Sequence, residues 1–160
     1  LKDYLKLDVA DISYLIKNVF SVLDVHLIVA GLNPPEHLVK EIERHEHITL
    51  ISNPEEEQMN DLIANAQINF LYTNQATGLK LKLLNVLYQG RHCLVNSKMV
   101  EGTTLAACCI VEDNIDKQII KIKNLMEEEV YPEIIEKRKS ILLENYSNEK
   151  NFGRIMEVFK

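Results

Sequence analysis

The chain has 160 residues, of which 46% are hydrophobic and 26% are charged, enough for one globular domain with its own core. Its net charge of −6 argues against the broad basic face that binds nucleic acid, so no nucleic-acid partner is expected. The three cysteines lack C-x-x-C spacing, and no apolar run approaches the ~20 residues of a membrane span. These features predict a reduced, cytoplasmic protein with no transmembrane segment.

Hydrophobic periodicity predicts one helix and then alternating strands and helices. Apolar residues at helical spacing predict a first helix over Asp8–Leu23. Short apolar runs predict strands at His26–Gly31, Ile48–Ser52, Ile68–Tyr72 and His92–Asn96, with a weaker one at Cys108–Glu112. Helices are predicted over Asn33–Arg44, after Asn53–Glu56, and over Leu79–Gln89, Asn114–Glu127, Glu133–Glu144 and Asn148–Phe159.

Two Asn-Pro junctions mark the starts of predicted helices. In the first, the pattern predicts Asn33 as the N-cap, Pro34 at the first helical position and Glu36 completing a capping box. Asn53–Glu56 repeats the same start signal after the next strand. The repetition indicates a shared strand-to-helix turn rather than a duplication.

The alternation of strands and helices predicts the fold. Parallel strands need crossover connections, and those connections are right-handed. The apolar runs are continuous, as strands covered on both faces require. We therefore expect a doubly wound, Rossmann-like α/β fold with helices on both faces of a parallel sheet. Residues 1–160 form a single domain in this prediction, with residues 113–160 as its C-terminal helices.

Ligands of such folds bind at the carboxyl ends of the strands. The predicted loops there are rich in Asn, Thr, Ser and Gly, which suit a sugar or nucleotide and equally suit helix capping. These loops are Gly31–Asn33, Ser52–Pro54, Tyr72–Gly78 and Asn96–Thr103.

Two of these loops have the features of anion sites. Gly78 precedes a helix whose first N–H groups can hold a diphosphate, and Lys80 and Lys82 add positive charge beside it. The alternative is a plain turn with two solvated lysines. The Glu101–Thr103 loop can bind phosphate oxygens through its backbone or can simply cap a turn. His45–His47 is a poor metal site because neighbouring side chains point apart, so no metal is expected.

A segment of the chain resembles a known enzyme family. Residues 48–96 read ITLISNPEEEQMNDLIANAQINFLYTNQATGLKLKLLNVLYQGRHCLVN, which is a strand, helix, strand, loop, helix, glycine and strand. This order resembles the C-terminal, donor-binding half of GT-B glycosyltransferases of the retaining, glycogen-synthase-like type, especially small bacterial members. The resemblance covers about Val25 to Glu112. The family's basic pair near its first strand and loop is not visible, because we expect the chain to start inside or after that strand, and LKDYLKL is a poor substitute.

The resemblance implies a donor substrate, a nucleotide-diphosphate sugar of UDP or GDP type, and no cofactor. Its base would bind near Ser52–Pro54 and its diphosphate near Gly78 and the Glu101–Thr103 loop. The family carries two glutamates around this helix. Asn85 occupies the position of the one that binds the ribose, and Thr77 occupies the position of the one that faces the sugar. The candidate binding residues are Ser52, Asn53, Thr77, Gly78, Lys80, Lys82, Asn85, Glu101, Gly102 and Thr103.

The leading prediction is therefore the donor-binding domain of a glycosyltransferase, with an acceptor that the sequence does not identify. We expect a piece of a longer enzyme whose N-terminal acceptor domain is its partner, and a piece that is inactive alone. Its expected location is cytoplasmic, with the inner face of the membrane as an alternative. The alternative function is a non-catalytic Rossmann-like module that binds a nucleotide or another protein.

Overall fold

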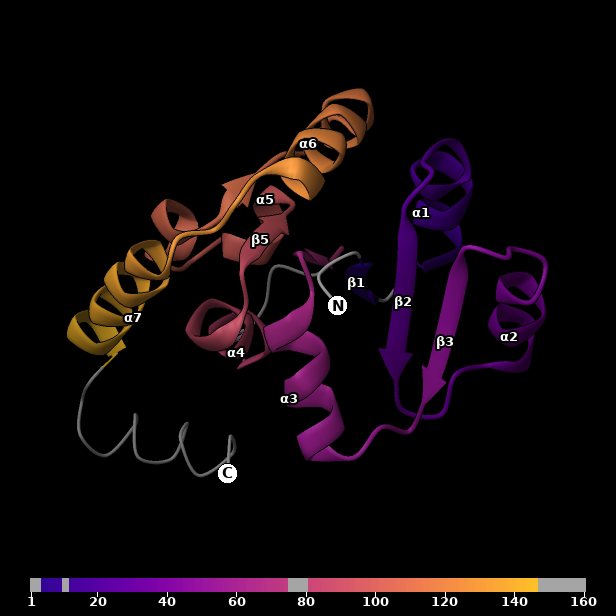
Figure 1. The fold of residues 1–160 in the computed structure, drawn as a ribbon, viewed down its shortest axis with the longest axis horizontal. Helices are drawn as coiled ribbons and strands as arrows, with labels where there is room; N and C mark the ends of the chain where they lie inside the picture. The colour runs from indigo at the N-terminus through magenta and orange to yellow at the C-terminus, as the bar shows by residue number, and fades with distance from the viewer. Residues whose placement is uncertain (1–3, 10–11, 75–80, 147–160) are drawn as a thin grey trace.

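The computed structural model contains a parallel β-sheet with helices on both faces (Figure 1). It describes residues 4–9, 12–74 and 81–146. The strands in this part of the chain are β1 Tyr4–Val9, β2 His26–Gly31, β3 Ile48–Ser52, β4 Ile68–Tyr72, β5 His92–Val95 and β6 Ile110–Val111. Their order is β3-β2-β1-β4-β5-β6, and each neighbouring pair is parallel. The predicted Rossmann-like α/β class is confirmed.

The helices follow the predicted order. They are α1 Ile12–Asn18, α2 Glu36–Ile42, α3 Glu56–Asn65, α4 Leu81–Gln89, α5 Ser97–Val100, α6 Ile115–Glu127 and α7 Pro132–Tyr146, with short 3-10 helices η1 Phe20–Val22 and η2 Leu105–Cys108. The helix predicted at Asn148–Phe159 lies outside the described residues. No helix in the described ranges combines the length and the apolar character that crossing a membrane requires.

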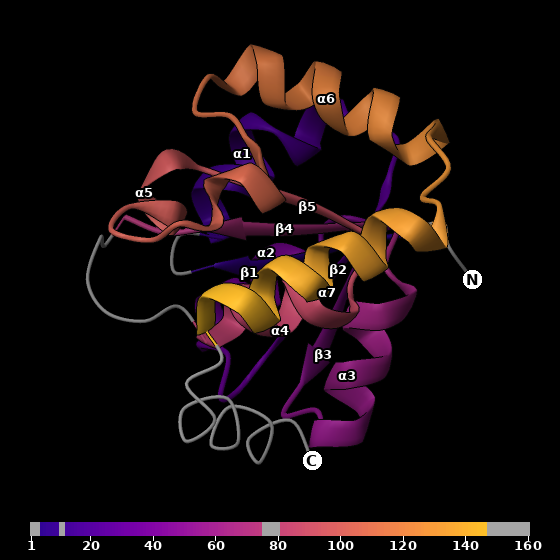
Figure 2. The ribbon, with the colours of Figure 1, turned by 90° about the vertical axis from the view of Figure 1, so that its left-hand side faces the viewer.

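Each face of the sheet has its own hydrophobic core. Helices α1, α2 and α6 pack on one face, and α3, α4 and α7 pack on the other. Figure 2 shows α1 and α6 on one side of β4 and β5, and α3, α4 and α7 on the opposite side. Strand β4 contributes to both cores, because Ile68 and Phe70 face the first and Leu71 faces the second. The run INFLY is apolar except for Asn69, and this mainly apolar run predicted β4 with the bounds that the structure has.

The start of the chain differs from the prediction. Residues Asp8 and Val9 belong to strand β1 and not to a helix, so the helix predicted over Asp8–Leu23 is wrong at its beginning. Strand β1 pairs with β2 on one side and β4 on the other. The central strand therefore begins at Tyr4, within LKDYLKL, and runs to Val9. Lysine and aspartate interrupt its apolar residues, and this removes the signal of a central strand.

The two Asn-Pro junctions also differ from the prediction. Asn33 and Asn53 have positive φ angles of 46° and 52°, and α2 and α3 begin later, at Glu36 and Glu56. Neither helix has a side-chain cap hydrogen bond, so the predicted capping box is wrong. Proline disfavours the right-handed helical conformation for the residue before it, and asparagine tolerates the left-handed one.

The two asparagines instead connect neighbouring strand ends. The Asn53 Oδ1 atom accepts a hydrogen bond from the Asn33 backbone N–H at 2.7 Å, and the Asn53 N–H donates to the Gly31 carbonyl at 2.8 Å. The loops after β2 and β3 are therefore held together at the carboxyl edge of the sheet.

Candidate functional site

The strand order reverses at the centre of the sheet. Strand β1 lies between β2 and β4, with α1 following β1 on one face and α4 following β4 on the opposite face. Connections that leave a sheet in opposite directions open a crevice at the carboxyl ends of the strands, and ligands of open α/β sheets bind there.

A first cavity, of about 430 Å³, lies on the α1 side of this edge. We call it the α1–α2 cavity. Its walls come from the start of α1, the end of β2 and the start of α2, and include Ser13, Tyr14, Pro35 and His37. Lys82 of α4 also lines it, although α4 packs on the opposite face of the sheet.

A second cavity, of about 380 Å³, lies on the α4 side, and we call it the α3–α4 cavity. Met59 and Ile63 of α3 and Val86 of α4 form apolar walls, and Asn85 supplies an amide. Most of its lining is apolar, which suits a flat ring or the carbon face of a sugar.

The two cavities share one boundary. Ala30, Gly31 and Leu32 at the end of β2 line both of them, and so does Lys82. A Cβ atom placed on Gly31 would have no atom within 4 Å, so this boundary is not closed by side chains packed against it. Lys82 could therefore bind the anionic part of a ligand whose two uncharged parts occupy the two cavities.

Asn85 belongs to a small amide network between α3 and α4. Its Nδ2 atom donates to Asn60 Oδ1 at 3.4 Å, and Gln89 Nε2 donates to Asn60 Oδ1 at 3.0 Å. Gln89 Nε2 also donates to Asn85 Oδ1. These contacts orient the half-buried Asn85 amide. The Asn85 amide has two N–H donors and two oxygen lone pairs, so one N–H and one lone pair remain for a ligand such as a sugar diol.

The structure brings only some of the predicted site residues together. Lys82 and Asn85 meet at the α3–α4 cavity. Ser52 and Asn53 are exposed at the end of β3 and line neither cavity. Thr77, Gly78 and Lys80 lie outside the described residues.

The Glu101–Thr103 loop also lines neither cavity. Gly102 has a φ of 74° and is exposed beside the exposed Glu101. The Thr103 hydroxyl donates to the Val100 carbonyl at 2.7 Å and accepts from the Leu105 N–H at 3.2 Å. The hydroxyl therefore caps a turn, the second of the two roles considered for this loop.

Asn96 has a role that the sequence did not predict. It is buried at the end of β5, where its Nδ2 atom donates to the Thr73 carbonyl at 2.7 Å and its Oδ1 atom accepts from the Thr73 N–H at 3.2 Å. Lys98 Nζ donates to the next carbonyl, that of Asn74, at 3.3 Å. Both residues hold the beginning of the loop that connects β4 to α4. An asparagine directly after a buried strand was the only sequence signal.

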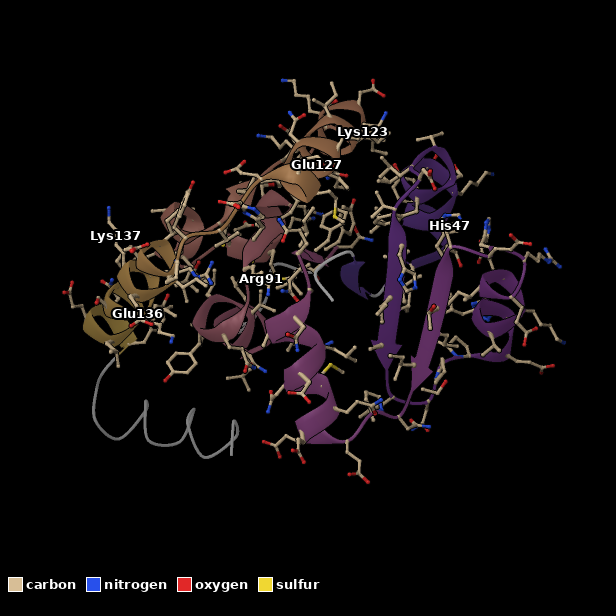
Figure 3. All side chains as sticks on the ribbon, in the orientation of Figure 1. His47, Arg91, Lys123, Glu127, Glu136 and Lys137 are labelled. Atoms are coloured by element: carbon tan, nitrogen blue, oxygen red, sulfur yellow. The ribbon has the colours of Figure 1, made fainter. Side chains whose placement is uncertain are left out.

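His45 and His47 lie at the opposite edge of the sheet. The rings of His45 and His47 are in edge contact with centroids 5.8 Å apart, and His47 Nε2 lies 3.2 Å from the Phe20 carbonyl oxygen. Figure 3 places His47 beside α1, at the amino end of the strands. Among the described side chains, no group of three or more His, Cys, Asp or Glu is arranged to hold a metal ion.

No protein-family model matches the chain, and no curated protein matches it. The fold and the edge of the sheet therefore define only a class, a Rossmann-like α/β domain with adjoining cavities at the point where its strand order reverses.

Proposed function

We propose that the chain binds a nucleotide-diphosphate sugar of UDP or GDP type and is the donor-binding domain of a glycosyltransferase. The observation that supports this most is the position of Lys82 between two adjoining cavities at the carboxyl edge of the sheet. A nucleotide sugar has the same order of chemistry, with an anionic diphosphate between an uncharged nucleoside and an uncharged sugar.

The residues around the two cavities suggest how the donor lies. The diphosphate binds near Lys82, where an ammonium group compensates its charge. The ribose binds near Asn85, whose amide can donate to one hydroxyl and accept from the other. Ser52 and Asn53 line neither cavity, so we place the base against the apolar walls of the α3–α4 cavity instead of near Ser52–Pro54, and the sugar extends toward the α1–α2 cavity.

Transfer of the sugar needs more than this edge. A second domain would bring the acceptor and exclude water from the reacting centre. Thr77 stands where the family resemblance has a glutamate facing the sugar, so we expect slow transfer, or none, even with an acceptor present. Donor binding is therefore the property to test first.

Lys82→Ala is expected to weaken binding of the preferred nucleoside diphosphate about tenfold, or about 1.4 kcal/mol. The loss arises because the side chain compensates phosphate charge. Calorimetric titration of UDP, GDP, ADP and CMP, and then of UDP- and GDP-sugars, measures it. Lys123→Ala is the matched control, because Lys123 is exposed on α6, outside both cavities (Figure 3). Equal affinities of Lys82→Ala and the unmodified protein would contradict the assignment.

Asn85→Ala is expected to abolish a preference for ribose over deoxyribose. The unmodified protein should bind UDP or GDP several-fold more tightly than its 2′-deoxy form, because the amide contacts the hydroxyl. The variant should bind both equally. The control is Asn124→Ala, an exposed amide on α6. A ribose preference that survives in Asn85→Ala would place the ribose elsewhere.

Failure of every nucleotide to bind would contradict the proposal as a whole. If the full-length protein binds the donor tightly but transfers no sugar, this would instead support the non-catalytic nucleotide-binding alternative.

A further inference from the structure

Cys93 lies in β5, and Cys109 is the residue directly before β6. The parallel register of β5 and β6 pairs Leu94 with Ile110 and Val95 with Val111. Extended by one residue before β6, this register would place Cys109 beside Cys93. The Cys109 backbone is already extended, with φ −119° and ψ 161°, so it continues the direction of β6.

Both side chains point to the same face of the sheet. Successive residues of a strand alternate between faces. Val95 and Val111 pack in the core under α3, α4 and α7, together with Cys93, Cys109 and also Cys108. Leu94 and Ile110 belong to the opposite core. Cys93 and Cys109 therefore face the same core, and the alternation of strand residues favours Cys109 over Cys108 as the lateral neighbour of Cys93.

The spacing suits a covalent bond. Neighbouring strands are about 4.7–4.9 Å apart, within the range of about 4.4–6.8 Å that Cα atoms of a disulfide span. The neighbouring Cys109 side chain and burial raise the pKa of Cys93 well above its ordinary value, so Cys109 rather than Cys93 is the thiol that attacks peroxide first. Cys93 is only 2% exposed, whereas Cys109 is half-buried and can be reached by a small oxidant.

We propose that Cys93 and Cys109 form a reversible intrachain disulfide when the protein meets hydrogen peroxide. The Cys109 sulfur attacks one peroxide oxygen, the O–O bond breaks, and the thiol proton leaves with the other oxygen as water. The Cys93 sulfur then attacks the resulting sulfenic sulfur. The S–O bond breaks, and the hydroxyl leaves as a second water with the Cys93 proton. Two thiols are oxidised, and one peroxide is reduced to two waters.

The bond would tie together the segment that leaves β5 and returns to β6. This segment contains α5 and the Glu101–Thr103 loop, which follows the carboxyl edge of β5. Strand β6 has only two residues, so a covalent link supplements a short ladder of hydrogen bonds. The inference depends on the register of β5 and β6, and it stands whether or not the chain binds a nucleotide sugar.

The test treats the folded protein with hydrogen peroxide, blocks the remaining thiols under denaturing conditions, and maps peptides by mass spectrometry without reduction. The expected product is a monomer lighter by two hydrogens, with Cys93 linked to Cys109 and Cys108 blocked. Dithiothreitol should restore all three thiols. Linkage of Cys108 to either neighbour, dimers linked through cysteine, or sulfinic acid at Cys109 without a linked peptide would each overturn the proposal.

Serine variants separate the three thiols. Cys108→Ser is the matched control and should form the same linked peptide at the same rate as the unmodified protein. Cys109→Ser should form none, and since Cys109 is only half-buried this variant is expected to fold. Circular dichroism of each reduced variant checks the fold, so the result does not depend on Cys93→Ser, which alters a buried site.

Discussion

Replacing Arg138 by alanine is expected to lower the free energy of unfolding by about 3–5 kcal/mol, through unsatisfied buried carbonyls and a cavity. Arg138 lies on α7 and is 7% exposed. Its guanidinium donates three hydrogen bonds to backbone carbonyls: Nε to Leu87, Nη2 to Gly90, and Nη1 to Arg91 at 2.7 Å. No other described side chain joins α7 to the rest of the protein through so many bonds.

The position of these carbonyls explains the size of the effect. They lie at the end of α4, where carbonyl groups have no partner within the helix and carry partial negative charge. Burial lowers the pKa of Arg138, but arginine remains charged, so the cation compensates the end of the helix. Alanine would leave buried carbonyls without donors and a void between α4 and α7.

Urea denaturation at neutral pH measures the loss, and the melting temperature should fall by about 10 °C. Arg138→Met separates packing from hydrogen bonding, because methionine fills much of the volume without a donor and should still lose most of the stability. Lys137→Ala is the control, since Lys137 is exposed one residue away (Figure 3), and should change stability by less than about 0.5 kcal/mol. A loss below about 1 kcal/mol in Arg138→Ala would show that water replaces the guanidinium.

The role of Arg138 illustrates what the sequence could not predict. Its acceptors lie 47 to 51 residues earlier in the chain, and nothing in the local pattern of α7 distinguishes it from a solvated arginine. Asn96 is similar, because its partner Thr73 is 23 residues away. Such contacts depend on which elements meet in space, whereas periodicity reports only which face of each element is apolar.

The strands with mainly apolar runs were predictable. Strands β2, β3 and β4 have the predicted bounds because each is a short apolar run with at most one polar residue inside it, Thr49 in β3 and Asn69 in β4. Strand β1 was not predictable. It lies at the centre of the sheet, but Lys6 and Asp8 interrupt its apolar residues. The start of the chain therefore resembled a loop before a helix.

Missing β1 also limited the prediction of the site. The positive charge near Gly78 led to Lys82, and the family resemblance led to Asn85; both residues line the α3–α4 cavity. The α1–α2 cavity needs the strand order of the finished sheet, because its walls come from the elements on both sides of β2. Its lining residues Tyr14 and His37 accordingly had no part in the predicted site.

Gly90→Ala is expected to destabilise the protein by about 2–4 kcal/mol, although it adds a single methyl group. A Cβ atom on Gly90 would lie 2.7 Å from the Val86 carbonyl oxygen and 2.8 Å from Asn69 Nδ2. Neither atom can move freely. The Val86 oxygen accepts the Gly90 N–H at 2.8 Å, and Asn69 Nδ2 donates to the Ile63 carbonyl at 3.0 Å.

Gly31→Ala is the control for this substitution, because a Cβ there meets no atom within 4 Å, and we expect a change of less than about 1 kcal/mol. Gly102→Ala tests backbone strain alone, since Gly102 has open space but a φ of 74°, and should cost about 1 kcal/mol. Urea denaturation of the three variants ranks them. If Gly90→Ala costs no more than Gly31→Ala, the end of α4 can shift without loss.

A double variant identifies which neighbour resists the methyl group. Asn69 is fully buried in β4, and in the described structure its Oδ1 atom has no hydrogen-bond partner. Asn69→Ala removes the amide that the new Cβ would meet, so Gly90→Ala should cost less in that background if the amide is the obstacle. Additive costs would instead assign the obstacle to the Val86 carbonyl. The Gly90 carbonyl also accepts a hydrogen bond from Arg138. Additive costs would therefore mean that the loss of stability in Gly90→Ala comes from the same turn of backbone to which Arg138 is bonded.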